Sequence, residues 1–580
     1  MTPASAALYA RLAASASTAA GWLGKQAGWR HALASTGFGM LSVLAMAPFF
    51  LWPVLFATLP GLVWLIDASL KTANDGVFRQ HGRRTIRTHA AMRAAATGWL
   101  FGFGYHLAGL FWIGEAFLVE AEKFAVLMPF AVTLMPAGLA LFWAAAAAAA
   151  SFAWRPGLQR PGLQRVVALA IALSAAEWLR GHVLSGFPWN VLGYALTWPL
   201  PLMQSASVFG IYGLTLLTVI IFAAPGVLLS EALEQSGAAP ARRRWIPIVA
   251  PLGMIGLLFG SGLIRLAGID PVLSPSRRVR IVQPSVPQRE KWLPQNQERI
   301  FRQHLELSLR NALGKVDGAQ GVSLILWPEA AMPFLPLRSP AALEAIGRML
   351  PKGAYLASGA LRLVDAVEAE PGGHRDIFNS LMMFGETGEL VANYDKIHLV
   401  PFGEYLPLQS TLEFIGLEQL SRLRGGFASG VRPRPLLTVP GLPELGPLIC
   451  YEAIFPATLV QGRERPAAFI NVTNDGWFGN TTGPRQHFHQ TRVRAVEEGL
   501  PILRAANNGI SAIIDAKGRV LARADLNEVA TIDGEIPAAL APPPYARFGD
   551  AIFVFLMGAA LLLLAYLDQI HRRVAGLPQS

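Results

Sequence analysis

Eight long apolar segments constrain the fold of this chain more than any other feature. A helix needs about 20 mostly apolar residues to cross a bilayer, and several of the segments come close to that length. They cover residues 33–50, 53–70, 94–118, 125–153, 166–180, 207–230, 245–267 and 549–567. Because 53% of the residues are hydrophobic and only 15% are charged, the composition also points to the membrane. The sequence therefore predicts an α-helical membrane bundle of about eight spans.

Basic residues between the apolar segments predict how this bundle is oriented. They gather at 71–93, 155–165, 242–244 and 571–573. With eight spans, all four clusters fall on one side, and an excess of Lys and Arg marks that side as cytoplasmic. The formal net charge of +11 is better explained by this topology than by nucleic acid, which we do not expect as a partner. The long segment 268–548 must then lie outside the cytoplasm.

Near Ser276 the composition changes, and short β-type segments begin to alternate with turns and helical stretches. Strands are predicted at Val279–Gln283, Val322–Trp327, Ala354–Ser358, Ser380–Phe384, Val391–Asp395, Leu445–Cys450, Ala467–Val472, Leu503–Ala505, Ser511–Asp515 and Val520–Arg523, and a helix at Asn296–Leu313. This alternation predicts a layered α/β domain with its sheet beneath helices. We therefore expect a transmembrane domain at 1–267, an extracytoplasmic domain at 268–548, and a last transmembrane helix with a cytoplasmic tail at 549–580.

Three short segments each place a reactive side chain after a predicted strand. They are Leu326–Ala330, Asn393–Pro407 and Pro447–Pro456. Acyl transfer through a thiol needs a nucleophile, a base for its proton, and a cation or donor for the developing oxyanion. The three segments supply one group of each kind, namely the thiol of Cys450, the carboxylate of Glu329 and the ammonium of Lys396. Taken alone, Cys450 could equally be a small buried hydrophobic residue, as most free cysteines are, and as the only cysteine it excludes an intramolecular disulfide.

The motifs around these residues resemble a known family. Trp-Pro-Glu at 327–329, Tyr-Asp-Lys at 394–396 and Cys-Tyr-Glu at 450–452 resemble the nitrilase (carbon-nitrogen hydrolase) superfamily with its Glu-Lys-Cys triad. The run Lys-Ile-His-Leu-Val-Pro-Phe-Gly-Glu-Tyr-Leu-Pro that begins at Lys396, in a chain with eight predicted spans, resembles the apolipoprotein N-acyltransferase family of Gram-negative bacteria. The resemblance covers essentially the whole chain. It implies a nitrilase-like α-β-β-α sandwich for the soluble domain.

The resemblance also implies a reaction, a location and roles for the triad. An acyl chain would leave a membrane phospholipid for the cysteine as a thioester, and the α-amine of a diacylglyceryl-cysteine apolipoprotein would then take it, with no cofactor. Cys450 would be the nucleophile, Glu329 the general base and Lys396 the cationic member. A thiol has an unperturbed pKa of ~8.5, so a nearby ammonium should favour its thiolate. The implied location is the bacterial inner membrane, with the catalytic domain facing the periplasm.

Five further residues are weaker candidates for substrate binding or support of the site. Glu404 matches an essential carboxylate of the family, but could be a solvated loop acid. Tyr451 could pack beneath the sheet, whereas Glu452 should point to the same face as Cys450 if the strand continues. Asn379 matches a family position near the site, but could be a buried residue at a strand edge. Trp292 could belong to a lid beside the acyl chain or be an exposed loop aromatic.

Other interpretations of the sequence are weaker. His487 and His489 could suggest a metal, but no carboxylate or cysteine completes a site at ligand spacing, so we predict none. The turn Asn474–Phe478 could line the cleft or support the fold. A membrane-tethered nitrilase-type amidase would need one anchor rather than eight spans. A lipid-binding or transport protein with an inactive domain is disfavoured by the intact triad and by the few ionisable groups in the spans.

The predicted topology can be tested with tags at two positions. A tag after Ser580 should be cytoplasmic and one near Arg375 should be external, because a single span separates the two positions. Labelling each tag from either side of the membrane measures this directly. Finding both tags on the same side would contradict the eight-span topology.

Overall fold

The computed structural model describes residues 3–74, 83–153, 162–234, 245–271, 277–364, 376–408, 411, 414, 426–462 and 464–574. The chain forms two compact units. The helical unit consists of Met1–Phe111, Pro129–Ala267 and Arg547–Ser580, and the α/β unit of Trp112–Met128 and Gly268–Ala546. Some positions used in the predictions lie outside the described residues. They are Arg79, the basic residues at 155–160 and 242–244, and the tag positions Arg375 and Ser580.

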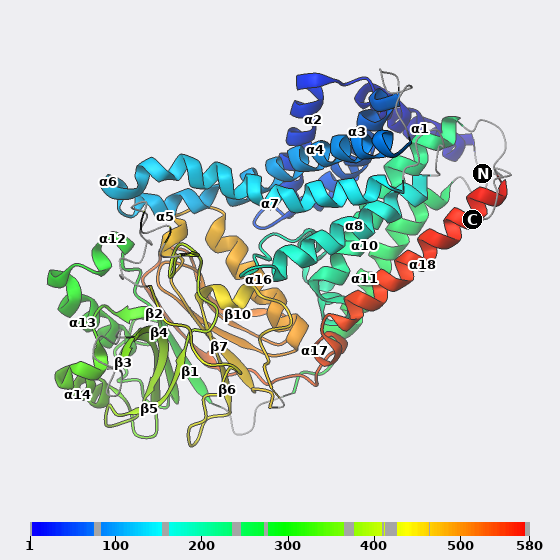
Figure 1. Cartoon of the computed structure of the whole chain (residues 1–580). Helices are drawn as coiled ribbons and strands as arrows, with labels where there is room; N and C mark the ends of the chain where they lie inside the picture. The colour runs from blue at the N-terminus through cyan, green and yellow to red at the C-terminus, as the bar shows by residue number, and fades with distance from the viewer. Residues whose placement is uncertain are drawn as a thin grey trace. The chain divides into compact units, whose positions relative to one another are not determined.

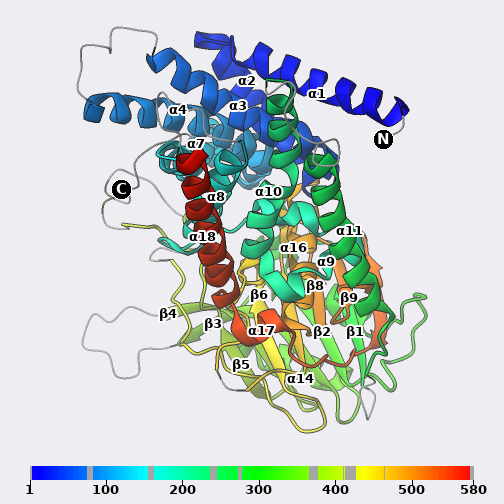
Figure 2. The same cartoon turned by 90° about the vertical axis from the view of Figure 1, so that its right-hand side faces the viewer.

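The helical unit is built mainly from long apolar helices. Its main helices are α1 (Pro3–Leu23), α2 (Gly28–Ser42), α3 (Leu55–Asn74), α4 (Arg83–Leu110), α7 (Met128–Ser151), α8 (Gly162–His182), α10 (Ala206–Glu234), α11 (Ile246–Ala267) and α18 (Ala551–Val574). Figure 2 shows α10 and α11 running alongside each other. The short segments between the helices include the 3-10 helices η1 (Val43–Ala45), η2 (Trp52–Val54) and η6 (Leu192–Leu196), and helix α9 (Leu200–Met203).

Six helices in the described residues are long and apolar enough to cross a membrane. They cover Trp52–Leu70, Ala121–Ser151, Gly162–His182, Ala206–Glu231, Ile246–Ala267 and Ala551–Arg573. The other two predicted spans differ from the structure. Helix α2 has only 15 residues, about 22 Å at 1.5 Å per residue, and ends at Ser42 instead of continuing to 50. Helix α4 is longer, but it starts in a basic stretch and ends at Leu110, eight residues before the predicted span does.

Small residues explain how α2 and α4 nevertheless pack closely. An added Cβ on Gly39 would lie 1.9 Å from the carbonyl oxygen of Phe101, and one on Gly104 would lie 2.1 Å from that of Thr36. Only glycine allows two helix backbones to approach so closely, which is how helices associate where lipid replaces water. The two segments therefore form a tight helix pair within the helical unit.

The α/β unit contains two sheets. The six-stranded sheet has the order β11-β1-β2-β3-β4-β5 and the five-stranded sheet the order β10-β9-β8-β7-β6. The strands are β1 (Arg278–Gln283), β2 (Leu324–Met332), β3 (Tyr355–Val364), β4 (Asp376–Phe384), β5 (Leu390–Asp395), β6 (Leu445–Ile449), β7 (Ala468–Thr473), β8 (Ile502–Ala506), β9 (Ser511–Ile514), β10 (Val520–Ala524) and β11 (Ala530–Glu535). The first three strands of the chain pair in parallel, as do β6, β7 and β8. Every predicted strand is confirmed, although β2 continues five residues and β3 six residues beyond the predicted end.

Hairpins join later strands of each sheet. Strands β4 and β5 pair antiparallel around Thr387-Gly388, and β9 and β10 around Lys517-Gly518. Both glycines have positive φ, 82° and 76°, a conformation that side chains with a Cβ adopt with strain.

The two sheets face each other across one hydrophobic core, which includes Ile281, Leu326, Leu381, Ile449 and Ile470. A second core lies between the six-stranded sheet and α13 (Gln297–Ser308) with α14 (Pro340–Met349), and a third between the five-stranded sheet and α16 (Gly483–Glu498). Figure 1 shows α13 and α14 beside β2 and β3. The predicted α-β-β-α sandwich is confirmed.

Three elements of the sandwich were not predicted, namely α14, α16 and β11. Helix α16 is the clearest case, because it is buried nearly all round and carries polar residues such as Gln490, Arg494 and Glu497 inward. It therefore lacks the apolar stripe at a period of 3.6 residues by which a helix packed on a sheet is normally recognised.

Candidate active site

The ends of three strands bring Glu329, Lys396 and Cys450 together. Glu329 lies in β2, Lys396 directly follows β5 and Cys450 directly follows β6. The side chains are nearly inaccessible, because Glu329 is 8% exposed, Lys396 1% and Cys450 7%. Lys396 Nζ lies 3.8 Å from Glu329 Oε1, and the charges of both residues act on the Cys450 thiol. Side chains that are 54 or more residues apart in the sequence thus share one buried site.

Unusual backbone conformations hold Cys450 and Glu329 in place. Cys450 has φ 50° and Ala330, next to Glu329, has φ 47°, a region that non-glycine residues occupy only where the surrounding structure imposes it. At Cys450 the chain turns sharply from β6 into the 3-10 helix η10 (Cys450–Ile454). At Glu329 the facing residue must be small, because an added Cβ on Gly359 of β3 would lie 2.5 Å from Glu329 Cα.

Asn379 and Glu404 complete a hydrogen-bonded cluster around Lys396. Asn379 Nδ2 donates to Glu329 Oε1 at 2.7 Å and to Glu404 Oε1 at 2.8 Å. Lys396 Nζ donates to Glu404 Oε1 at 2.9 Å, and the amide of Val400 donates to Glu404 Oε2 at 2.8 Å. Glu404 is therefore buried in the site rather than solvated on a loop, and Asn379 bridges the two carboxylates.

The alternation that would place Glu452 on the same face as Cys450 does not apply, because the strand does not continue to these residues. The strand ends at Ile449, and the 3-10 turn that follows redirects the side chain. Its carboxylate accepts hydrogen bonds from Tyr394 Oη at 2.6 Å, from the Ile449 amide at 2.8 Å and from the amides of Ile397 and His398 at 3.2 Å. Glu452 thus ties the turn that carries Cys450 to the main chain just after Lys396.

Tyr451 and Trp292 lie in different surroundings. Tyr451 is buried, with its ring edge-on to Phe455 at a centroid distance of 4.9 Å and to His398 at 5.6 Å. It packs in an aromatic cluster beside the nucleophile. Trp292 is 42% exposed, so the structure places it on the surface of the α/β unit, at the end of the short helix α12 (Gln288–Lys291).

The residue before Trp292 is part of the site and was missed by sequence analysis. Lys291 is 1% exposed, and its Nζ donates to the main-chain oxygen of Glu329 at 2.9 Å. A lysine in a charged Glu-Lys-Trp sequence carries no signal of burial, because its position depends on how α12 folds back onto β2.

A second missed cluster lies behind the nucleophile. His487 Nε2 donates to the main-chain oxygen of Cys450 at 3.2 Å, while Nδ1 lies 2.8 Å from Asp475 Oδ1. Arg504 Nη2 donates to Asp475 Oδ2 at 2.8 Å. Burial would raise the pKa of Asp475, but Arg504 and His487 lower it to about 2. The turn at Asn474–Phe478 therefore supports the nucleophile, and His487 is engaged by these partners. Among the described residues, no group of three or more His, Cys, Asp or Glu could hold a metal.

Lys396 lowers the pKa of the Cys450 thiol, as expected, but other groups around the thiol act more strongly in the opposite direction. Burial and the Glu329 carboxylate raise the pKa of Cys450 well above its usual value, and they outweigh the opposite effect of Lys396. Burial would lower the pKa of Lys396, but Glu404 and Glu329 raise it above its usual range. The site therefore combines a thiol and an ammonium whose pKa values are both raised with a carboxylate 3.8 Å from the ammonium.

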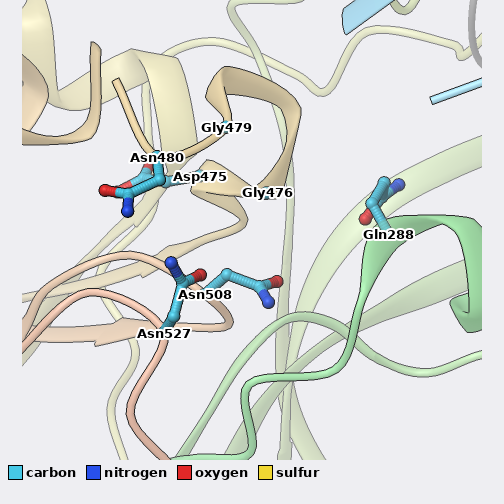
Figure 3. A pocket seen from close by; sticks show the side chains of 7 residues that line it. All are labelled: Gln288, Asp475, Gly476, Gly479, Asn480, Asn508 and Asn527. Carbon is cyan, nitrogen blue, oxygen red and sulfur yellow. The ribbon is translucent and has the colours of Figure 1, made fainter. Parts of the chain in front are cut away.

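A small polar pocket adjoins the cluster behind the nucleophile (Figure 3). It is lined by Gln288, Asp475, Gly476, Gly479, Asn480, Asn508 and Asn527. Its volume of about 80 Å³ is enough for a few water molecules at about 30 Å³ each. A pocket of this size and polarity does not fit an acyl chain.

Comparisons with known proteins agree with this architecture. Residues 278–542 match the family model of carbon-nitrogen hydrolases, and residues 38–224 match that of the apolipoprotein N-acyltransferase N-terminal domain. A Rhodopseudomonas palustris protein is 45% identical over 93% of this chain and 95% of its own length, and one from Bradyrhizobium diazoefficiens is 44% identical over 94% and 96%. Both are named apolipoprotein N-acyltransferase.

A solved carbon-nitrogen hydrolase from Helicobacter pylori G27 is 14% identical, with a TM-score of 0.31 over 45% of this chain and 89% of its own.

The charge of Glu329 should suppress the reactivity of Cys450 toward small reagents. Because Glu329 raises the pKa of the thiol, Glu329→Gln should lower that pKa and speed alkylation by iodoacetamide at pH 8. A fall of half a pKa unit would raise the thiolate fraction about threefold. Intact mass gives the rate directly, since Cys450 is the only cysteine. Glu298→Gln, at an exposed residue of α13, should leave the rate unchanged. Slower alkylation in Glu329→Gln would contradict this electrostatic account.

Proposed function

The chain belongs to the apolipoprotein N-acyltransferase family, and on that premise we propose that Cys450 carries an acyl chain from a membrane phospholipid to a lipoprotein. The acceptor is the N-terminal amine of a diacylglyceryl-cysteine apolipoprotein. The observation that best supports this is the buried cluster of Cys450, Glu329 and Lys396 in a chain that matches the family over nearly its whole length.

In the first half reaction, Cys450 attacks the ester carbonyl of the phospholipid. Because the thiol is protonated at rest, Glu329 must accept its proton as the S–C bond forms. The carbonyl oxygen becomes an oxyanion, which the ammonium of Lys396 stabilises. When this intermediate collapses, the C–O bond breaks, the leaving alkoxide takes the proton from Glu329, and a lysophospholipid departs. The products are the thioester on Cys450 and the neutral alcohol.

In the second half reaction, the amine of the apolipoprotein attacks the thioester. An α-amino group has a pKa of about 7.7–8.0, so a sizeable fraction is neutral and nucleophilic near neutral pH. Glu329 accepts a proton from the amine as the N–C bond forms, and then returns it to the departing sulfur of Cys450. The amide product leaves and the enzyme regains its starting protonation state, so the two half reactions form a ping-pong cycle.

Neighbouring residues prepare Lys396 and Glu329 for these steps. Glu404 holds the ammonium of Lys396 with a hydrogen bond of 2.9 Å, so Lys396 stays charged while remaining 3.8 Å from Glu329. Asn379 donates to one oxygen of Glu329, which leaves the other oxygen available for proton transfer. Tyr451 and Glu452 position the nucleophile, the former by packing and the latter by bonding to the main chain.

The protein is a membrane protein, as the six long apolar helices among its described residues indicate. We assign it to the bacterial inner membrane, with residues 268–548 on the periplasmic side. The basic clusters support this orientation, because cytoplasmic loops carry an excess of Lys and Arg. Such a location places the donor phospholipid and the lipid-modified acceptor in the same bilayer.

A membrane-tethered amidase could use the same triad, but it is not favoured. The match to the acyltransferase family includes the membrane-spanning region at 38–224 as well as the domain with the triad. A hydrolase of small amides has no need of such a region.

Cys450→Ala should abolish acyl transfer without affecting folding. The assay combines purified protein, phospholipid and a diacylglyceryl lipopeptide, and mass spectrometry follows the products. The parent protein should give triacylated lipopeptide and lysophospholipid in equal amounts, whereas the variant should give neither. Thermal unfolding of the two proteins should agree closely, because the substitution removes one sulfur atom at a strand end. Retained N-acylation would disprove the thioester route, and free fatty acid without N-acylation would favour a hydrolase.

A further inference from the structure

A second lysine lies in the active site with most of its hydrogen-bonding capacity unused. The ammonium of Lys291 can donate three hydrogen bonds. Among the described residues, its single protein acceptor is the main-chain oxygen of Glu329 at 2.9 Å. Because Lys291 is 1% exposed, bulk water does not supply the missing acceptors. Buried charged donors of this kind are costly unless a partner satisfies them.

The position of Lys291 is fixed by contacts on the same segment. Gln288 Oε1 accepts a hydrogen bond from Asn474 at 2.7 Å, and Arg289 donates to the main-chain oxygen of Leu118 at 2.9 Å. Just before α12, the amide and carbonyl of Val286 both bond to the side chain of Asn507, at 3.0 and 2.9 Å. A donor held this firmly has the preorganisation that stabilisation of a transition state requires.

The groups that face Lys291 come from three elements. The charges of Glu329 on β2 and Cys450 on η10 raise the pKa of Lys291. The charge of Lys291 in turn lowers the pKa of His304 on α13. Burial lowers the pKa of Lys291 to about 8, although Glu329 and Cys450 oppose this effect. Burial also lowers the pKa of His304 to about 4, so His304 is neutral at pH 7. Lys291 is therefore mostly charged at neutral pH and loses its proton at mildly alkaline pH.

Lys396 and Lys291 differ in how their donors are used. Lys396 already donates to Glu404 at 2.9 Å and pairs with Glu329 at 3.8 Å. Within the part of the chain that the structure describes, Lys291 donates to one main-chain oxygen, while its charge interacts with Cys450 and with the Glu329 carboxylate. The region between Glu329 and Cys450 is where the acyl carbonyl must sit during attack, and it gains negative charge there.

We propose that Lys291 is a catalytic residue that donates an N–H to the oxyanion formed on the acyl carbonyl oxygen in both half reactions. This inference rests on the proposed function. The oxyanion would provide the acceptor that the protein itself does not, and only while the tetrahedral intermediate exists. Lys291 would then stabilise the transition state more than the ground state, which is the condition for raising the rate.

The test measures thioester formation on Cys450 with phospholipid alone, from pH 6 to pH 10, by intact mass. Without the apolipoprotein, no acceptor amine titrates in this range. Loss of one oxyanion donor costs about 10²–10³ in rate, so Lys291→Met should be at least tenfold slower at pH 7. In the parent the rate should fall as pH rises through about 8, because the ammonium is then lost. Lys291→Arg should retain part of the parent's rate of thioester formation. Its rate should fall only at higher pH, because the guanidinium group stays protonated.

The matched control is Lys517→Met, which removes a buried lysine that bonds to Gly268 and Asp270 instead. It should match the parent in rate and pH profile. The inference would be overturned if Lys291→Met formed the thioester at a rate within twofold of the parent. It would also be overturned if the rate of Lys291→Arg fell at the same pH as the rate of the parent. If Lys291→Met does not fold, a flat parent profile between pH 7 and 9.5 overturns it alone. Failure of the parent itself to form a thioester would instead contradict the proposed function.

Discussion

The buried ion cluster of Lys396, Glu404 and Glu329 is the interaction on which the site depends. Lys396 lies 2.9 Å from Glu404 and 3.8 Å from Glu329, and Asn379 joins the two carboxylates. Removing one member of such a buried group leaves an uncompensated charge, at a cost of about 3–5 kcal/mol. The cluster fastens β2, β4 and the loop after β5 to each other. Through Glu452, the same loop is bonded to the turn that carries the nucleophile, so charge pairing and the position of Cys450 are coupled.

In the proposed mechanism, this coupling lets a thiol with a raised pKa serve as a nucleophile. Burial and the Glu329 carboxylate raise the pKa of the thiol, and Glu329 is the group proposed to receive its proton. Under that proposal, the thiolate forms only as the substrate carbonyl is attacked, which would limit side reactions of the single cysteine. Lys396 remains charged throughout because Glu404 and Glu329 raise its pKa. The two lysines therefore have different properties, one permanently charged and one that titrates near pH 8.

The sequence predicted the parts that follow a regular pattern and missed those set by tertiary contacts. Alternating and apolar segments located the predicted strands, and the motifs around Glu329, Lys396 and Cys450 located residues that the fold brings together. Helix α16 was missed because its buried face is polar, and α2 is shorter than its apolar segment because the chain turns after Ser42. The expectation for Glu452 depended on a strand that continues past Cys450, whereas the strand ends at Ile449. The sequence around Lys291 does not indicate that this residue is buried, because its burial depends on where α12 lies in the folded domain.

The most direct test of the proposed mechanism is a single-turnover chase. The protein is first incubated with phospholipid carrying a labelled acyl chain and then separated from all lipid donor. Diacylglyceryl lipopeptide is added to the isolated acyl-protein, and intact mass is followed for both partners. We expect the label to leave Cys450 and to appear on the amine of the lipopeptide in equal amount. A label that stays on the protein, or that is released only as free fatty acid, would contradict a thioester intermediate on the path to the lipoprotein.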